Sequence, residues 1–344
     1  MMPTPERSIL IIYTGGTIGM VHEPDTGALV PFDFSHISDQ VPELRRFGYR
    51  LDTITFDPVI DSSDVSPDLW LRMASLIEEK YETYDGFVLL HGTDTMAYTA
   101  SALSFLLQNL EKPVIMTGSQ LPIGLLRTDG KENLITAIEI AASRADGKPL
   151  VPEVCIYFEN KLMRGNRTTK LSAEHFNAFG SPNYPPLAEA GVHIRYNKRY
   201  IRYPGIREQF AAAGKLCTDV ALLKLFPGIS RDVVESITAI EGLKAIILET
   251  YGSGNAPTSP WITESLGSFT KRGGIIVNVT QCHGGTVEME TYRTGRVLLD
   301  LGVISGRDMT TEAALAKVMF VLGNSSGSER TVMLLNRSLA GEIT

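Results

Sequence analysis

Two threonines in glycine-rich turns are the residues whose types and spacing could do chemistry. Thr14 lies in YTGGTIG (13–19) and Thr93 in HGTDT (91–95), each directly after a short apolar run. Each apolar run predicts a buried strand that ends in a turn. Parallel α/β sheets place reacting groups at the carboxyl ends of strands, near a topological switch point. Two hydroxyls placed in this way, one of them beside the carboxylate of Asp94, indicate a nucleophile site.

The first turn has other interpretations. Glycines after a strand can cradle phosphate, but TGGTIG lacks the Lys-Ser/Thr end of a P-loop and the GxGxxG spacing. A tight turn without chemistry is the plainer alternative. A threonine hydroxyl is a weak nucleophile and needs a nearby base or a lowered pKa. The glycines would allow close approach of a substrate and expose N–H donors to an oxyanion.

Three further segments carry polar side chains next to predicted strands or helices. Asp94 can balance a substrate ammonium, whereas Thr95 could simply cap the next helix. DSSD (61–64) offers two hydroxyls and two carboxylates, with capping as the alternative. In RGNRTTK (164–170), Lys170 could act as a base or proton shuttle if burial and cationic neighbours lower its pKa, and a surface loop is the alternative.

The composition is that of an ordinary globular protein. The chain is 43% hydrophobic and 21% charged, which is typical of globular proteins. Its length of 344 residues predicts two domains. A net charge of -7 argues against nucleic acid or an anionic membrane as the main partner. We interpret the basic cluster between 195 and 207 as a solvated connector; its members are Arg195, Lys198, Arg199, Arg202 and Arg207.

Cysteine and histidine usage predicts no disulfide framework, no metal site and no cofactor. The three cysteines are widely spaced without CxxC, and the six histidines show no HxxxH spacing. No apolar stretch is long enough to span a bilayer, and the first apolar run is too short for a signal peptide. These features predict a cytoplasmic protein.

Alternation of strand, turn and helix predicts an α/β fold of two domains, each a mainly parallel sheet flanked by helices. Strands are expected at 8–13, 51–56, 87–90, 112–117, 154–158, 220–225, 245–248 and 275–279, and helices from 67, at 96–110, 133–142, 230–240 and 310–322. Residues 20–36 show no period and predict a mobile lid. Residues 177–216 lose the alternation, so we place the domains at 1–205 and 206–344.

Taken together, these segments resemble the asparaginase family, in its type I, cytoplasmic bacterial form. The matching motifs run in order along almost the whole chain; they include YTGGTIGM (13–20), DSSD (61–64), HGTDTMAYTASALSF (91–105), TGSQLP (117–122), RGNRTTK (164–170) and GSGNAP (252–257). The resemblance implies hydrolysis of L-asparagine to L-aspartate and ammonia through a threonine nucleophile and an acyl-enzyme, without a cofactor. It also implies tight homodimers, often paired into homotetramers.

The resemblance assigns roles to residues of this chain. Thr14 matches the nucleophile, and Thr93, Asp94 and Lys170 match a second catalytic set, although the sequence leaves open which threonine attacks. Backbone N–H groups near Gly16 and Thr93 are expected to form the oxyanion hole. Substrate binding is expected from Asp61, Ser62, Ser63, Thr93, Asp94 and Ser119. Asn255 matches a turn that approaches the neighbouring subunit's site.

Two departures from the family pattern stand out. Leu29 lies where many relatives carry a lid tyrosine that polarises the nucleophile, and Tyr292 is a candidate substitute. Thr169 and Cys282 match positions of an effector site for asparagine. Glu249 lies where that site would carry an arginine, and its carboxylate would repel an α-carboxylate. We therefore predict weak or absent allosteric activation.

Three rival functions remain open at this point. A glutaminase-asparaginase of broad specificity would use the same chemistry, because one methylene is worth only about 1–3 kcal/mol of discrimination. An amidotransferase subunit would carry an N-terminal extension before the first motif, whereas Thr14 lies close to the start of this sequence. An amino-acid sensor would not need the complete set of Thr14, Thr93, Asp94 and Lys170.

Overall fold

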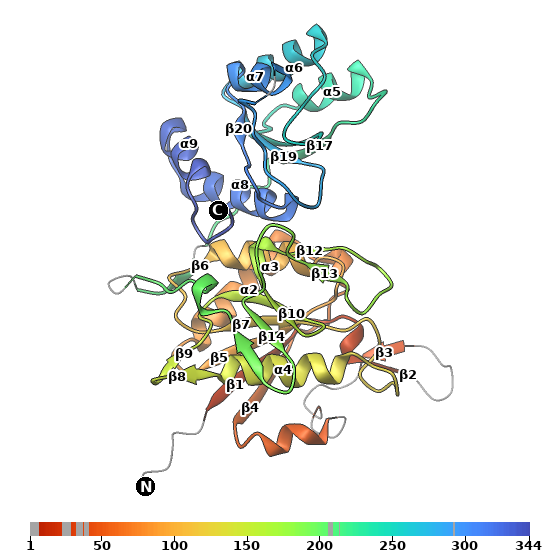
Figure 1. Cartoon of the computed structure of the whole chain (residues 1–344), viewed down its shortest axis with the longest axis vertical. Helices are drawn as coiled ribbons and strands as arrows, with labels where there is room; N and C mark the ends of the chain where they lie inside the picture. Colours follow the sequence, from red (N-terminus) through yellow and green to blue (C-terminus); the bar gives the residue numbers. More distant parts are fainter. Residues whose placement is uncertain are drawn as a thin grey trace. The chain divides into compact units, whose positions relative to one another are not determined.

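A computed structural model describes residues 7–22, 29–31, 37, 41–205, 209–212, 214–291 and 293–344. The chain divides into two compact units, Met1–Gly214 and Lys215–Thr344. Each is an α/β unit, as the sequence predicts (Figure 1). The division falls later than the sequence placed it, after 205, because β16 (Ala211–Ala212) pairs with β6 (Leu107–Gln108) of the first unit.

The first unit is built on an eight-stranded sheet with the order β15-β14-β11-β10-β7-β5-β1-β4. Its parallel strands are β1 (Ser8–Tyr13), β4 (Arg50–Thr55), β5 (Gly86–Leu90), β7 (Val114–Thr117) and β10 (Val154–Phe158). The antiparallel strands are β11 (Lys161–Arg164), β14 (Ala188–Ala190) and β15 (Ile194–Tyr196). Central strands such as β5 are apolar throughout because helices cover both faces of the sheet.

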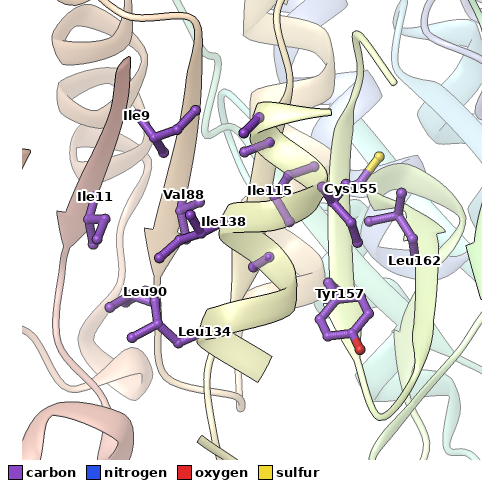
Figure 2. Close-up of a cluster of buried hydrophobic side chains, with 14 of the residues drawn as sticks. Ile9, Ile11, Val88, Leu90, Ile115, Leu134, Ile138, Cys155, Tyr157 and Leu162 are labelled. Atoms are coloured by element: carbon purple, nitrogen blue, oxygen red, sulfur yellow. The ribbon is translucent and has the colours of Figure 1, made fainter. Parts of the chain in front are cut away.

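Three long helices cover the two faces of this sheet. α2 (Pro67–Lys80) and α3 (Met96–Leu106) lie on one face and α4 (Gly130–Ala142) on the other (Figure 1). Figure 2 shows Leu134 and Ile138 of α4 packed over alternate residues of the strands, such as Val88 and Ile115. Because these residues are fully buried, the strand ends they support are fixed in position.

The point where the strand order changes direction lies between β1 and β5. β4 follows β1 in the chain and pairs on one side of it, and the chain then crosses through α2 to pair β5 on the other side. Connections leave the carboxyl ends of β1 and β5 in opposite directions, which opens the kind of crevice where α/β proteins bind ligands. Thr14 and Thr93 follow these two strands.

The second unit has a parallel four-stranded sheet, β17-β18-β19-β20. Its strands are β17 (Val220–Lys224), β18 (Ala245–Thr250), β19 (Ile275–Thr280) and β20 (Ile304–Ser305), and its helices are α5 (Arg231–Thr238), α6 (Pro260–Lys271), α7 (Arg293–Asp300), α8 (Thr311–Asn324) and α9 (Ser328–Asn336). The C-terminal segment is held by a fully buried ion pair, Lys317 Nζ to Glu342 Oε1 at 2.8 Å. Lys317 also donates to the carbonyls of Leu335 and Arg337, so its ammonium is well satisfied.

Some predicted boundaries differ from the structure. The helix expected at 96–110 ends at Leu106, because Leu107 and Gln108 leave the helix to pair with β16. The antiparallel extension after β10 was not predicted from the sequence. It begins at a two-residue hairpin in which Glu159 and Asn160 both have positive φ, 45° and 66°, and a Glu-Asn pair is a weaker turn signal than Asn-Gly.

The predicted lid falls largely outside the described residues. β2 (Met20–His22) and β3 (Leu29–Pro31) pair as antiparallel strands, with Leu29 opposite His22. Residues 23–28 and 32–36 are not described, so the lid hypothesis stays a prediction. No helix in the described part of the chain combines the length and apolarity that a membrane crossing needs.

Candidate active site

Thr14 is tied to the neighbouring strand by both its backbone and its side chain. Its amide N–H and its hydroxyl Oγ1 donate to the same acceptor, the carbonyl of Leu90 at the end of β5, at 3.0 and 2.9 Å. Only 3% of Thr14 is exposed. The hydroxyl is therefore held in a defined orientation at the switch point, as a nucleophile requires.

The glycines of the two turns permit a contact that no larger residue allows. A Cβ on Gly16, whose φ is 92°, would lie 2.6 Å from the Cα of Gly92. A Cβ on Gly92 would lie 2.5 Å from Ser62 Oγ. The first and second turns therefore meet backbone to backbone, and the Ser62 side chain of the DSSD segment packs against Gly92. The glycine pattern that resembled a phosphate cradle serves this close packing.

Lys170 joins Thr93 and Asp94 in a hydrogen-bonded set. Lys170 Nζ donates to Thr93 Oγ1 at 2.8 Å and pairs with Asp94 Oδ1 at 2.7 Å. The Lys170 side chain is 18% exposed and the Asp94 side chain 68%. Lys170 is placed by β12 (Thr169–Lys170), which pairs with β13 (Phe179–Gly180). The alternative of an unconnected surface loop at 164–170 is therefore wrong for Lys170.

Gln120 is a member of this network that the sequence analysis missed. Thr93 Oγ1 donates to Gln120 Oε1 at 3.3 Å, and Gln120 Nε2 donates to the carbonyl of His175 at 3.1 Å. The Asp129 carboxylate accepts the backbone N–H groups of Gln120 and Leu121 and so fixes this loop. The signal available in the sequence was the loop's position directly after β7, where a polar side chain reaches the same sheet edge.

The DSSD segment shows the capping contacts that were the alternative to a binding role. Asp61 caps its own turn, since its Oδ1 accepts from both N and Oγ of Ser63, at 2.9 and 2.7 Å. These bonds lower the pKa of Asp61. Ser62 is buried against Gly92, and the backbone N–H of Ile60 donates to the carbonyl of Thr14 at 2.8 Å. Ser119 is also buried, and its hydroxyl donates to the carbonyl of Leu121.

His91 is buried and contacts the carbonyl of Gly92 in the second turn. Its Nδ1 lies 2.7 Å from the carbonyl of Gly92, and its Nε2 lies 3.0 Å from Thr99 Oγ1, which also accepts from Trp70 Nε1. This chain is consistent with a neutral ring that donates from Nδ1 and accepts at Nε2. Burial lowers the pKa of His91 to about 4. The interpretation of this histidine as structural agrees with these contacts.

We expect His91 to make the protein less stable in mild acid. The unfolded chain takes up a proton as the pH falls through about 6.5, whereas the folded chain resists until about 4. The stability that the neutral ring contributes is therefore complete above 6.5 and is lost as the pH falls toward 4. The loss amounts to about 2 kcal/mol by pH 5. Urea unfolding at pH 7 and pH 5 measures it, and His91→Gln should show a smaller difference; equal differences would contradict this role.

The structure describes most of the residues that the resemblance assigns to a partner-subunit contact or to an effector site. Asn255 Oδ1 accepts from Thr294 Oγ1 at 2.6 Å within the second unit. Glu249 is largely buried, accepts from Thr311 Oγ1 at 2.6 Å and pairs with Lys224 at 3.3 Å. Cys282 is exposed just beyond β19. Thr169 belongs to β12 of the first unit. Tyr292 lies outside the described residues, as does the side chain of Leu29.

Comparison with known proteins identifies relatives over nearly the whole chain. Residues 8–202 match the family described as "Asparaginase, N-terminal", and residues 219–334 match "Glutaminase/Asparaginase C-terminal domain". L-asparaginase 1 of Escherichia coli K12 is 44% identical, with 98% of each chain covered. A mouse protein named 60 kDa lysophospholipase is 41% identical over 99% of this chain and 63% of its own length. The crystal structure of L-asparaginase I from Vibrio cholerae superposes with a TM-score of 0.89 at 42% identity, covering 98% of this chain and 99% of that one.

Proposed function

Because the chain belongs to the asparaginase family, we propose that it is an amidohydrolase that converts L-asparagine and water to L-aspartate and ammonia. One observation carries the proposal most strongly. Thr14 follows β1, and Thr93 and Asp94 follow the adjacent parallel strand β5; the glycine turns after these strands touch, and Lys170 of β12 is hydrogen-bonded to Thr93. An amide between the two threonines would meet a nucleophile and a proton-transfer group together.

In the first step, Thr14 Oγ1 attacks the side-chain amide carbon of asparagine. The oxyanion that forms is stabilised by backbone N–H groups near Gly16 and Thr93, which the close packing of the two turns brings to one place. Collapse of this intermediate breaks the C–N bond. The proton that the Thr14 hydroxyl loses on attack leaves on the amide nitrogen as part of ammonia, and an ester between Thr14 and the aspartyl group remains. The orientation of the Thr14 hydroxyl on the Leu90 carbonyl supports this role.

In the second step, water cleaves the ester and restores Thr14. Thr93 and Lys170 assist by relaying the proton from that water, since their side chains are joined by a 2.8 Å hydrogen bond. Asp94 keeps Lys170 in place through its 2.7 Å ion pair. Aspartate then leaves with its new carboxylate, and the atoms of one water molecule are divided between the two products.

Substrate selection rests on the groups around asparagine's α-carbon. We propose that Ser62 and Ser63 hold the α-carboxylate and that Asp94 holds the α-ammonium, with Asp61, Thr93 and Ser119 completing the pocket. An analogue that lacks either group would lose the hydrogen bonds or the ion pair that this group makes, which is a source of rejection. Assembly into a homodimer or homotetramer, approach of the Asn255 turn to the neighbouring subunit's site and a cytoplasmic location remain predictions from the resemblance.

The direct test is ammonia release from the purified protein with L-asparagine. L-glutamine, run in parallel, distinguishes the broad-specificity alternative. Lysophosphatidylcholine is included because of the mouse relative's name, with fatty-acid release as the measurement; it offers neither α-group and should not be hydrolysed. If neither L-asparagine nor L-glutamine released ammonia, the proposed function would be overturned in favour of a partner-dependent amidotransferase or a sensor.

We expect the asparagine saturation curve to be hyperbolic. The resemblance puts Glu249 where an arginine would bind an effector's α-carboxylate. The Glu249 carboxylate, which Lys224 and Thr311 contact, would repel that group. Initial rates over a wide range of asparagine concentrations give the shape of the curve. A clearly sigmoidal curve would contradict this prediction.

A further inference from the structure

Thr95 does not behave as the helix cap that its position predicts. It precedes α3 as the N-cap residue, but makes no side-chain cap bond within the described part of the chain. Its hydroxyl donates instead to the backbone carbonyl of Ser62, 33 residues away, at 2.6 Å. A threonine at an N-cap normally satisfies an N–H group of the first helical turn. Here the hydroxyl bond links two separate turns of the candidate site.

The DSSD segment is held from two directions. On one side, Ile60 N donates to the Thr14 carbonyl at 2.8 Å. On the other side, Thr95 holds the Ser62 carbonyl while the Ser62 side chain fills the space left by the absent Cβ of Gly92. The Thr95 bond therefore fixes the distance between the segment that carries Ser62 and Ser63 and the segment that carries Thr93 and Asp94.

We propose that Thr95 is a positioning residue for substrate binding. It acts by holding Ser62 and Ser63 at a fixed distance from Asp94. This inference rests on the function proposed above, in which these residues grip the two charged groups of the α-carbon. The two groups of one amino acid are a fixed distance apart. A shift of the 61–63 turn would weaken the grip on the α-carboxylate while leaving Thr14, Thr93 and Lys170 in place.

The test uses Thr95→Val, which keeps the shape of the side chain and removes the donor. We expect KM for L-asparagine to rise about tenfold, the effect of losing one hydrogen bond and leaving its acceptor unpaired, with kcat changed much less. Thr95→Ser retains the donor and should restore KM. Ser104→Ala is the matched control, because it removes a 2.7 Å hydroxyl-to-carbonyl bond that lies within α3 itself; it should not raise KM.

A double-mutant cycle separates positioning from general destabilisation. In a background with both Ser62→Ala and Ser63→Ala, Thr95→Val should raise KM much less than in the wild type, since both hydroxyls that Thr95 positions are already gone. Equal rises in both backgrounds, a fall in kcat at unchanged KM, or failure of Thr95→Ser to restore KM would each overturn the proposal. Wild-type ammonia release checks the proposed function separately: turnover with an unchanged KM in Thr95→Val refutes the role of Thr95 alone.

Discussion

Thr14→Ala is expected to lower kcat for L-asparagine by about 10⁴-fold or more, the scale of loss when a covalent nucleophile is removed. The reason is geometric as well as chemical. The Thr14 hydroxyl is buried and is oriented by its hydrogen bond to the Leu90 carbonyl, and Gly16 lies in the same turn. Single-turnover ammonia release measures the residual rate.

The control for Thr14→Ala is a second buried threonine at the end of a parallel strand. Thr117 ends β7, and its hydroxyl donates to the carbonyl of Tyr157 at 2.8 Å. Thr117→Ala therefore loses a comparable bond without losing the proposed nucleophile, and it should keep most of its turnover. If Thr14→Ala kept turnover within about tenfold while Thr93→Ala abolished it, Thr93 would be the nucleophile.

Lys170→Met is the second large effect that we expect, a fall in kcat of about 10²–10⁴-fold, as for loss of a general acid–base group. Methionine approximates the length of the aliphatic stem but cannot donate to Thr93 or pair with Asp94. The second step of the proposed reaction moves a proton through this set, so kcat should fall more than KM rises. Steady-state kinetics with L-asparagine measures the division between the two.

Lys161→Met is the matched control for Lys170, because Lys161 is exposed on the hairpin that opens β11. It should leave kcat unchanged. The expectation for Lys170 would be wrong if Lys170→Met raised KM alone, because that outcome would assign the lysine to substrate binding. Asp94→Asn should then show which of its two roles, holding Lys170 or holding the α-ammonium, contributes more.

Much of the first unit could be predicted from local patterns. The apolar runs before Thr14 and Thr93 are strands, and the alternation of strands and helices forms a mainly parallel sheet with both faces covered. Parallel strands buried on both faces produce continuous apolar runs that are visible in a sequence. The antiparallel strands β11 and β14 were missed because they are short and partly polar, and their pairing is decided by a turn and by neighbours distant in the chain.

The sequence by itself identified the residues that we propose to carry the chemistry, since the threonines, the carboxylate and the lysine lie in motifs whose residue types are readable one segment at a time. The tertiary structure decided which of them meet. Lys170 binds Thr93, which lies 77 residues away in the sequence, and Thr14 binds the carbonyl of Leu90, which lies 76 residues away. The Thr95 hydroxyl binds the carbonyl of Ser62 instead of capping its own helix. Such contacts depend on sheet order and on backbone approach at Gly16 and Gly92, which are properties of packing between segments and leave no local pattern.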